Sequence, residues 1–379
     1  MSTRVTVRPV SSKKDLKRFI DFQYDLYRDY PAWVAPLRRD VRRVLNPRKN
    51  AFFEHSAIHS MLAEDASGRV VGRIAAVVNG MHLQKYDDGN GFFGFFETID
   101  DYAVAEALLD AAIERLRSEG LTGVRGPANP SLNDTAGLLV GGFDREPSVL
   151  MPYNAPYYEA FLERHGFERA MTMWAYYIHK KYASTERLER GVEIVKQRNP
   201  GIRVRTIDMD RFEEEARTIL HIYNDAWSNN WGHVPMTEGE FGQLAGEMKQ
   251  IVDPNIVFIL EDAGRPVAFS ISLPNINQLL RHVDDGRLLP FGLPKMLAYA
   301  KWGGLYECRT PLMGVLREYQ GRGLDAVLNL AVIQEGPRNG YDASEMSWVL
   351  DSNKRLRNAL ESFGGVVDKE YAMFEKRIE

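Results

Sequence analysis

The chain has 379 residues, enough for two domains at roughly 150 residues per domain. Lysine and arginine number 48, and aspartate and glutamate number 52, for a formal net charge of −4. That balance excludes the basic footprint of a nucleic-acid-binding protein. The single cysteine, Cys308, excludes an intrachain disulfide framework and any metal site built from several cysteines. We therefore expect no bound metal and a reducing compartment.

The start of the chain and its hydropathy indicate a cytoplasmic protein. Residues 1–10 alternate like a strand and lack the apolar segment of a secretory signal. No apolar run approaches the roughly 20 residues that a membrane-spanning helix needs. The sequence therefore predicts a protein that does not span a membrane, although it is able to rest on the inner membrane.

The hydrophobic pattern of the first half predicts mixed α/β structure. In chain order its elements are a strand at 4–10, a helix at 12–28, a hairpin at 59–79, a strand at 92–99, a helix at 101–118, a strand at 122–126, a helix at 156–165 and a strand at 172–179. A charged, partly helical linker follows around 180–199.

The second half predicts the same order of elements. They are a strand at 202–207, a helix at 210–228, a hairpin at 255–272, a strand at 306–316, a helix ending near 335, a strand at 344–349, a helix after Asn353 and a strand at 371–378. Such an alternation is typical of helices layered on a mixed sheet.

Three short matches indicate that the chain repeats itself. Val5-Thr-Val-Arg-Pro-Val10 parallels Ile202-Arg-Val-Arg-Thr-Ile207, and Glu64 parallels Glu261 at the same offset. Leu162-Glu163-x-x-Gly166 parallels Leu360-Glu361-x-x-Gly364 at an offset one residue longer. Matches in one order at offsets within one residue of each other predict a tandem duplication. We expect domains at 1–180 and 201–379, joined by a linker at 181–200.

A glycine-bearing turn between the strand at 306–316 and the next helix carries a chemical signal. Its sequence is Val315-Leu-Arg-Glu-Tyr-Gln-Gly-Arg-Gly-Leu-Asp-Ala326. Glycine lets backbone N–H groups approach a phosphate closely, and a helix N-terminus adds to the attraction. This segment resembles the phosphate loop of the GNAT acyltransferase superfamily, whose order of elements is also the one predicted above.

The resemblance implies two tandem GNAT-like domains, each a mixed, mostly antiparallel sheet flanked by helices. It also implies an acyl-CoA N-acyltransferase, with acyl-CoA as co-substrate, an amine as acceptor and no permanently bound cofactor. By the resemblance, the backbone of Val315 and Leu316 pairs with the pantetheine arm. The pyrophosphate would be held by Gln320, Gly321, Arg322, Gly323 and Leu324. Asp325 departs from the pattern, because the family has a small residue there.

The first copy lacks this loop. At the corresponding place it carries Glu97, Asp100 and Asp101 and no glycine, which is a poor surface for a pyrophosphate. We expect only the C-terminal copy to bind coenzyme A, with the degenerate N-terminal copy shaping the acceptor site. The tyrosine that GNAT proteins often use as general acid is replaced by Leu162 and Leu360.

Several residues are candidates for catalysis or acceptor binding. An amine attacks a thioester only when neutral, so a base is required. Glu307, on the strand that leads into the loop, and His233, in the loop after the helix at 210–228, are the candidates, each with an ordinary surface role as the alternative. Cys308 is a weaker candidate for a covalent intermediate than for a buried thiol. Candidate acceptor-binding residues are Asn133, Tyr153, Asn154, Trp231 and Asn353.

The insertion around 273–304 combines apolar residues with scattered Lys, Arg and Trp. Such a segment suits an acyl tunnel cover or a membrane surface, and equally a helical clip between the copies. The whole chain resembles the tandem acyltransferases that include bacterial ceramide synthases, which implies transfer of a fatty acyl group to a sphingoid amine. The alternatives are an aminoacyl or small-amine transferase of the tandem GNAT type and a non-catalytic acyl-CoA sensor.

Overall fold

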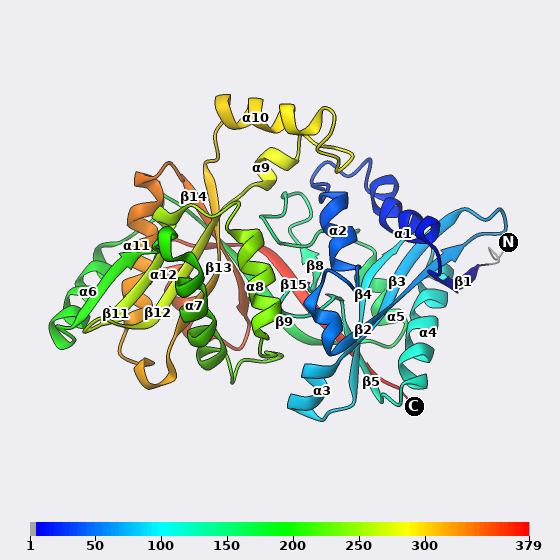
Figure 1. The fold of residues 1–379 in the computed structure, drawn as a ribbon, viewed down its shortest axis with the longest axis horizontal. Coiled ribbons are helices and arrows are strands. Elements are labelled where there is room, and N and C mark those ends of the chain that lie inside the picture. Colours follow the sequence, from blue (N-terminus) through cyan, green and yellow to red (C-terminus); the bar gives the residue numbers. More distant parts are fainter. Residues whose placement is uncertain (1–4, 379) are drawn as a thin grey trace. The chain divides into compact units, whose positions relative to one another are not determined.

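The computed structural model describes residues 5–378, which divide by their contacts into two compact units (Figure 1). Unit 1 contains the described residues up to Thr172, Leu279–Ala298 and the described residues from Lys369 on. Unit 2 contains Met173–Gln278 and Tyr299–Asp368. Each unit therefore combines segments from both halves of the sequence.

Unit 1 is a mixed sheet with helices, in the order β1-β2-β3-β4-β5-β15. Neighbouring strands are antiparallel except β4 and β5, which are parallel. The elements are β1 (Thr6–Pro9), α1 (Lys13–Leu26), α2 (Arg38–Val44), η1 (Ala51–Glu54), β2 (Ser56–Glu64), β3 (Val70–Asn79), α3 (Gly80–Tyr86), β4 (Asn90–Thr98), α4 (Tyr102–Ser118), β5 (Gly123–Gly126), β6 (Ala128–Asn129), β7 (Thr135–Ala136), β8 (Leu138–Gly141) and α5 (Tyr158–Arg164).

Unit 2 repeats the plan, with strand order β9-β14-β13-β12-β11-β10 and one parallel pair, β13 with β14. The remaining elements are β9 (Glu168–His179), α6 (Glu186–Arg198), β10 (Ile202–Thr206), η2 (Met209–Arg211), α7 (Phe212–Ala226), α8 (Glu238–Met248), η3 (Pro254–Ile256), β11 (Val257–Asp262), β12 (Arg265–Pro274), α9 (Asn277–Leu280), α10 (Gly292–Trp302), β13 (Glu307–Val315), η4 (Arg317–Tyr319), α11 (Leu324–Arg338), β14 (Ala343–Leu350), α12 (Lys354–Ser362) and β15 (Val366–Arg377). The predicted fold class, mixed mostly antiparallel sheets flanked by helices, is confirmed.

The two copies exchange their last strands. β9, the last strand of the first copy, pairs with β14 in unit 2, where Met173 lies opposite Leu350 and His179 opposite Ala343. β15, the last strand of the second copy, pairs with β5 in unit 1. Phe374 of β15 is fully buried in the apolar core of unit 1. Each sheet is thus completed by the sequence of the other copy.

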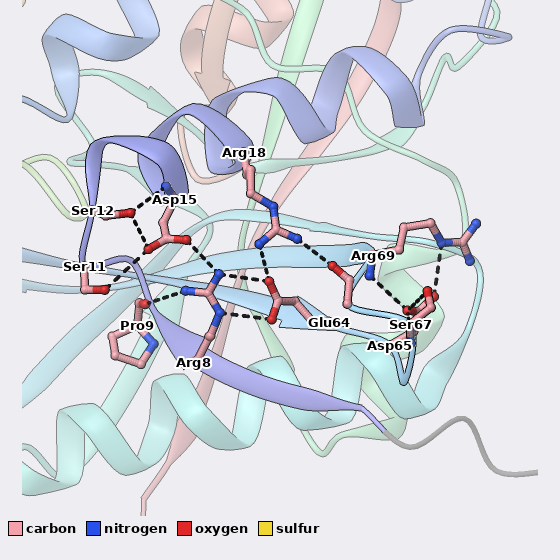
Figure 2. A network of polar contacts seen from close by, with 11 residues as sticks. Arg8, Pro9, Ser11, Ser12, Asp15, Arg18, Glu64, Asp65, Ser67 and Arg69 are labelled. Carbon is pink, nitrogen blue, oxygen red and sulfur yellow. Dashed lines mark hydrogen bonds and ion pairs between the residues drawn. The ribbon is translucent and has the colours of Figure 1, made fainter.

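The first two repeated motifs encode one ion-pair arrangement (Figure 2). In unit 1, Arg8 of β1 binds the Glu64 carboxylate at 2.9 and 3.0 Å and the Asp15 carboxylate of α1 at 2.7 Å. In unit 2, Arg205 binds Glu261 at 2.6 Å and Glu215 of α7 at 3.0 Å. The arginine joins the first strand, its neighbour and the first helix, which explains why these positions recur.

The third repeated motif marks the end of a helix. Gly166 follows α5 with φ +85° and Gly364 follows α12 with φ +92°, a region that favours glycine. A Cβ atom at Gly364 would lie 2.2 Å from the carbonyl oxygen of Tyr182. Leu162 and Leu360, four residues earlier, are fully buried. The third motif therefore marks a helix that ends at a glycine, with a leucine of its last turns buried in the core.

The structure adds helices that the hydrophobic pattern did not predict. α2 and α3 are seven residues each, too short to show a helical period, and five of the seven residues of α2 are charged. α8 is held by a capping box between Thr237 and Glu240. Among residues 5–378, no helix combines the length and apolarity needed to cross a bilayer. The predicted strand at 4–10 begins one residue outside the described range.

We expect Arg8→Met to lower the thermal midpoint of unfolding at neutral pH and to matter progressively less in acid. Hydrogen bonds from Arg8 lower the pKa values of Asp15 and Glu64 below their usual range. Carboxyl groups with depressed folded-state pKa values contribute stability above their unfolded pKa, and lose it as the pH falls through the folded value. Circular dichroism melts across this range test the expectation. Arg69→Met, which removes a side chain that is 73% exposed, is the control and should change the midpoint little.

Candidate functional site

Strands β13 and β14 form a fork in unit 2. They pair over four residues only, Glu307–Thr310 with Ala343–Met346. β13 then continues along β12, while β14 continues along β9. Beyond Thr310, the edge of β13 that faces β14 has no ladder partner among the described strands. Backbone groups at such an edge can pair with an extended ligand, as they do with an added strand.

The backbone N–H and C=O groups of successive residues in β13 point to opposite sides, and this alternation determines which of them face the fork. The N–H of Leu316 donates to the carbonyl of Val267 on β12 at 2.9 Å. Because successive strand residues point their backbone groups to opposite sides, Val315 turns toward the fork. Its carbonyl accepts a hydrogen bond from Gln320 Nε2 at 3.1 Å. Of the two predicted pantetheine-pairing residues, Val315 thus directs its N–H toward the fork, whereas the N–H of Leu316 is already used.

The glycine turn leads from β13 into an open helix N-terminus. Gly321 and Gly323 have φ values of +79° and +82°, and Gly323 is the N-cap of α11. No side chain accepts a hydrogen bond from the N–H groups in the first turn of that helix. Only the backbone of the preceding loop therefore positions these N–H groups. A Cβ atom at Gly323 would lie 2.7 Å from Val195 Cγ2 of α6, whereas one at Gly321 meets open space.

Charged side chains around the turn are tied to neighbours. Arg322 donates to the carbonyl of Glu318 at 3.0 Å and lies over the ring of Tyr319. Asp325, which departs from the family pattern, lies 3.7 Å from the guanidinium of Arg355 at the start of α12. The nearby cation reduces the repulsion that this carboxylate would exert on a phosphate.

A pocket of about 460 Å³ opens beside the same turn. Asp225 of α7 accepts hydrogen bonds from the Arg317 backbone N–H at 2.7 Å and from its Nε at 3.0 Å. Burial alone would raise the pKa of Asp225, but these hydrogen bonds outweigh it and hold the pKa below the usual value. The pocket is lined by His221, Asp225, Arg265, Leu316, Arg317 and Glu318. It therefore carries both signs of charge.

The predicted base Glu307 is the first residue of β13 and lies at the end of the fork where β13 and β14 are paired. It is half-buried, and its carboxylate accepts hydrogen bonds from the hydroxyl of Tyr177 at 2.8 Å and from Asn275 Nδ2 at 3.3 Å. Tyr177 belongs to β9, the exchanged strand. No sequence pattern connects Tyr177 with Glu307, because this contact depends on which strand completes the sheet.

The other predicted base, His233, is buried in the loop between α7 and α8. Its ring packs edge-on against Tyr223 at 5.3 Å between centroids, and Tyr223 lies 5.1 Å from Trp227. Trp227 Nε1 donates to the carbonyl of Met313 on β13 at 3.0 Å. A chain of aromatic rings thus leads from His233 to the fork. Trp231 is half-buried in the same loop.

A buried arginine that we did not predict spans the fork where the strands separate. Arg309 is 3% exposed, and it donates to Ser347 Oγ at 2.9 Å and to the Ser347 carbonyl at 3.0 Å. Ser347 is the first residue of β14 beyond the ladder, and its hydroxyl donates to Glu345 at 2.7 Å. Arg309 thereby supplies hydrogen bonds where the strand pairing ends. A charged residue beside Glu307 would ordinarily be solvated, so its burial could not be foreseen.

The single cysteine is not a nucleophile in this environment. Cys308 is 2% exposed, and burial raises the pKa of its thiol to about 11. The thiolate, which is the reactive form, is therefore scarce at neutral pH. The interpretation of Cys308 as a buried thiol agrees with this position.

The helix that carries the acid tyrosine in many GNAT proteins has a structural role at the corresponding position. Leu360 of α12 and Leu162 of α5 are both fully buried. Asn353, a predicted acceptor-binding residue, is the N-cap of α12, and its Oδ1 accepts a hydrogen bond from the Leu356 N–H at 3.2 Å. It therefore fixes the start of this helix.

In unit 1 the corresponding fork is filled by the chain itself. β4 and β5 pair only at Asn90–Phe92 with Gly123–Arg125. Beyond that, the Phe95 N–H donates to Asn129 Oδ1 at 2.5 Å. The next helix, α4, is capped by Asp101, whose carboxylate accepts from the Ala103 N–H at 3.0 Å. The backbone donors at the corresponding places of unit 1 are thus satisfied by side chains of unit 1.

Glu97, one of the carboxylates that distinguish the first copy, lies in the interior of unit 1. The hydroxyls of Tyr27 and Tyr158 donate to it, the latter at 3.0 Å. Burial raises the pKa of Glu97 above its usual value. Its carboxylate is consequently part of a packed polar cluster and faces no phosphate loop.

The acceptor-binding residues predicted in the first copy lie in two loops of unit 1. Asn154 is buried, accepts a hydrogen bond from the Leu139 N–H at 2.7 Å and donates to the Leu139 carbonyl at 3.1 Å. Tyr153 donates to the Phe143 carbonyl at 3.1 Å, and the Asn133 N–H donates to Ser131 Oγ at 3.1 Å. These contacts hold the loops in shape, and a role in acceptor binding stays a prediction.

Comparison with curated proteins gives two full-length relatives. The chain is 36% identical over 377 residues to Protein YghO of Escherichia coli (strain K12), covering 98% of this chain and 95% of that protein. It is also 36% identical over 379 residues to the Bacterial ceramide synthase of Caulobacter vibrioides (strain NA1000 / CB15N), covering 99% and 98% of the two chains. No protein-family model matches the sequence.

Solved structures with the same fold are more distant in sequence. A tandem GNAT protein from the clavulanic acid biosynthesis pathway superposes with a TM-score of 0.58 at 12% identity, covering 99% of both chains. A GCN5-related N-acetyltransferase from Sphaerobacter thermophilus gives a TM-score of 0.54 at 12% identity, covering 99% of this chain and 96% of that one. The tandem GNAT fold is thereby confirmed. By its full-length identity to these two curated relatives, the chain belongs to the family that includes the bacterial ceramide synthase and Protein YghO.

Proposed function

We propose that the protein is an acyl-CoA-dependent N-acyltransferase whose unit 2 binds the acyl-CoA. The observation that carries this proposal is the fork between β13 and β14, which ends in the glycine turn and the uncapped N-terminus of α11. An edge for an extended arm therefore leads directly to a cradle for phosphates. Unit 1 has the same fork without the turn, and its backbone donors are satisfied by Asn129 and Asp101.

The pyrophosphate would lie against the backbone of Gly321 to Leu324, with Gln320 fixing the loop to Val315 and Arg322 adding positive charge. The pantetheine arm would pair with Val315 and bring the thioester into the fork. Leu316, with its N–H already engaged, would contribute apolar contact only. These roles rest on the geometry of the loop and on the family resemblance.

For transfer, a neutral amine nitrogen attacks the thioester carbonyl, the new C–N bond forms, and the C–S bond then breaks. The attacking nitrogen loses one proton, for which Glu307 is the proposed acceptor, with His233 as the second candidate. The leaving thiolate has a conjugate acid pKa near 8.5, so it departs without an acid in place of Leu360.

We infer that the acceptor is a long-chain amine. One full-length relative is named a bacterial ceramide synthase, and a ceramide is the amide of a fatty acid with a sphingoid base. At 36% identity over the whole chain, a related donor and acceptor class is the simplest expectation. The acceptor-binding roles of Asn133, Tyr153, Asn154, Trp231 and Asn353 belong to this proposal.

Gly321→Asp should weaken coenzyme A binding by at least about tenfold, because it places a carboxylate beside the pyrophosphate. Aspartate tolerates a positive φ, and a Cβ atom at this position meets open space. Titration calorimetry with coenzyme A measures the change. Ala103→Asp, in the first turn of α4, is the matched control and should leave affinity unchanged. Equal effects of the two changes would refute the assignment of coenzyme A to unit 2. Gly323→Glu is a less clean probe, because it also clashes with Val195.

Free coenzyme A should be released when the protein is supplied with a long-chain acyl-CoA and a sphingoid base, as followed with a thiol reagent. Glu307→Gln should lower kcat by about 100-fold or more, the usual worth of a general base. Cys308→Ala should retain kcat, because the thiol is buried and protonated. Binding of acyl-CoA with no thiol release for any amine would identify a sensor instead. Release only with small amines would favour a small-amine transferase.

A further inference from the structure

The insertion of the second copy has an anchored part and a protruding part. The anchored part, residues 279–286, packs within unit 1. The Arg38 N–H donates to the Gly286 carbonyl at 3.0 Å, and Arg38 Nε donates to the Asp285 carbonyl at 2.6 Å. Arg281 pairs with Glu146 at 3.0 Å. A Cβ atom at Gly286 would lie 2.4 Å from the Pro36 carbonyl oxygen, so this end of the insertion fits closely.

The protruding part, residues 287–297, exposes large apolar side chains. Leu289 is 72% exposed, Phe291 73% and Leu297 63%, and Leu293 is also exposed. Leu293 and Leu297 are one turn apart on α10 and so lie on one face of that helix. Four large exposed apolar groups lie within nine residues of the sequence, in contrast to the isolated exposed apolar residues that are normal on a surface.

The charge of the protruding part is positive, although the whole chain carries −4. Arg287 and Lys295 are its only charged residues, and both side chains are exposed. Arg287 pairs with Asp285 at 3.4 Å, so the positive charge of this segment rests on Lys295. Along the sequence, no acidic residue occurs between Asp285 and Glu307. Apolar groups beside an exposed lysine match the boundary between the acyl chains and the headgroups of an anionic bilayer.

We propose that residues 287–297 dock the protein on an anionic lipid surface. Leu289, Phe291 and Leu297 enter the interface, and Lys295 lies among the headgroup phosphates. A second copy is a poorer occupant, because a symmetric contact would set this positively charged segment against an identical one. Docking goes beyond the proposed function, since it requires neither acyl-CoA nor transfer, and it would hold the enzyme where a lipid amine is dissolved.

The test is co-sedimentation of the full-length protein, without acyl-CoA, with vesicles of phosphatidylcholine alone or mixed with phosphatidylglycerol. The protein should bind the anionic vesicles at least about tenfold more tightly than the neutral ones, and added salt should weaken this binding. The double variant Phe291→Glu, Leu297→Glu should lose binding, and Lys295→Glu should lose the preference for anionic vesicles. Ile194→Glu changes an exposed apolar residue of α6 and is the matched control.

Lack of binding by the unaltered protein, or equal binding by the double variant, would overturn the proposal. The proposal would also be overturned if the unaltered protein failed to bind vesicles and sedimentation velocity showed a dimer that the double variant converts to a monomer. A second copy of the chain would then be the occupant of this segment. Circular dichroism melts of every variant verify that the fold is retained. Because vesicle binding is measured without substrate, its failure is distinguishable from a failure of the proposed transfer reaction.

Discussion

Two parallel strands that stop pairing after four residues leave backbone donors and acceptors that must find other partners, and the rest of unit 2 is arranged around that requirement. Arg309 supplies hydrogen bonds to Ser347 at the point of separation. Trp227 and Gln320 satisfy carbonyl groups farther along β13. What they leave is a strand edge and a helix N-terminus, both suited to an extended ligand that ends in phosphates.

The duplicated fold meets the same requirement in two ways. In unit 1, Asn129 caps the opened edge of β4, and Asp101 caps the helix that follows. A side chain that satisfies a backbone donor permanently removes it from ligand binding. Side chains at the fork and at the helix start therefore determine whether these backbone groups are satisfied internally, while the surrounding sheet is kept.

Much of the fold could be predicted because the sequence records it locally. Alternating strands, amphipathic helices and the repeated Arg8 and Arg205 positions each depend on neighbours within one copy. The glycine turn was also visible, since Gly321 and Gly323 are only two residues apart in the sequence. The burial of Arg309 and the contact of Tyr177 with Glu307 were not, because they depend on strands that meet only in the folded sheet. His233 illustrates the same limit, because its neighbours in the folded structure determine whether its side chain is exposed or buried.

The exchange of final strands also constrains the order in which the protein can form. Unit 1 lacks the second partner of β5, and Phe374 in its core, until the ribosome has made residues near 377. The first half therefore leaves the ribosome with an open sheet edge, which is a site for wrong pairing. The two copies cannot mature one after the other, as independent tandem domains do, and loss of the last dozen residues would damage the half of the molecule made first.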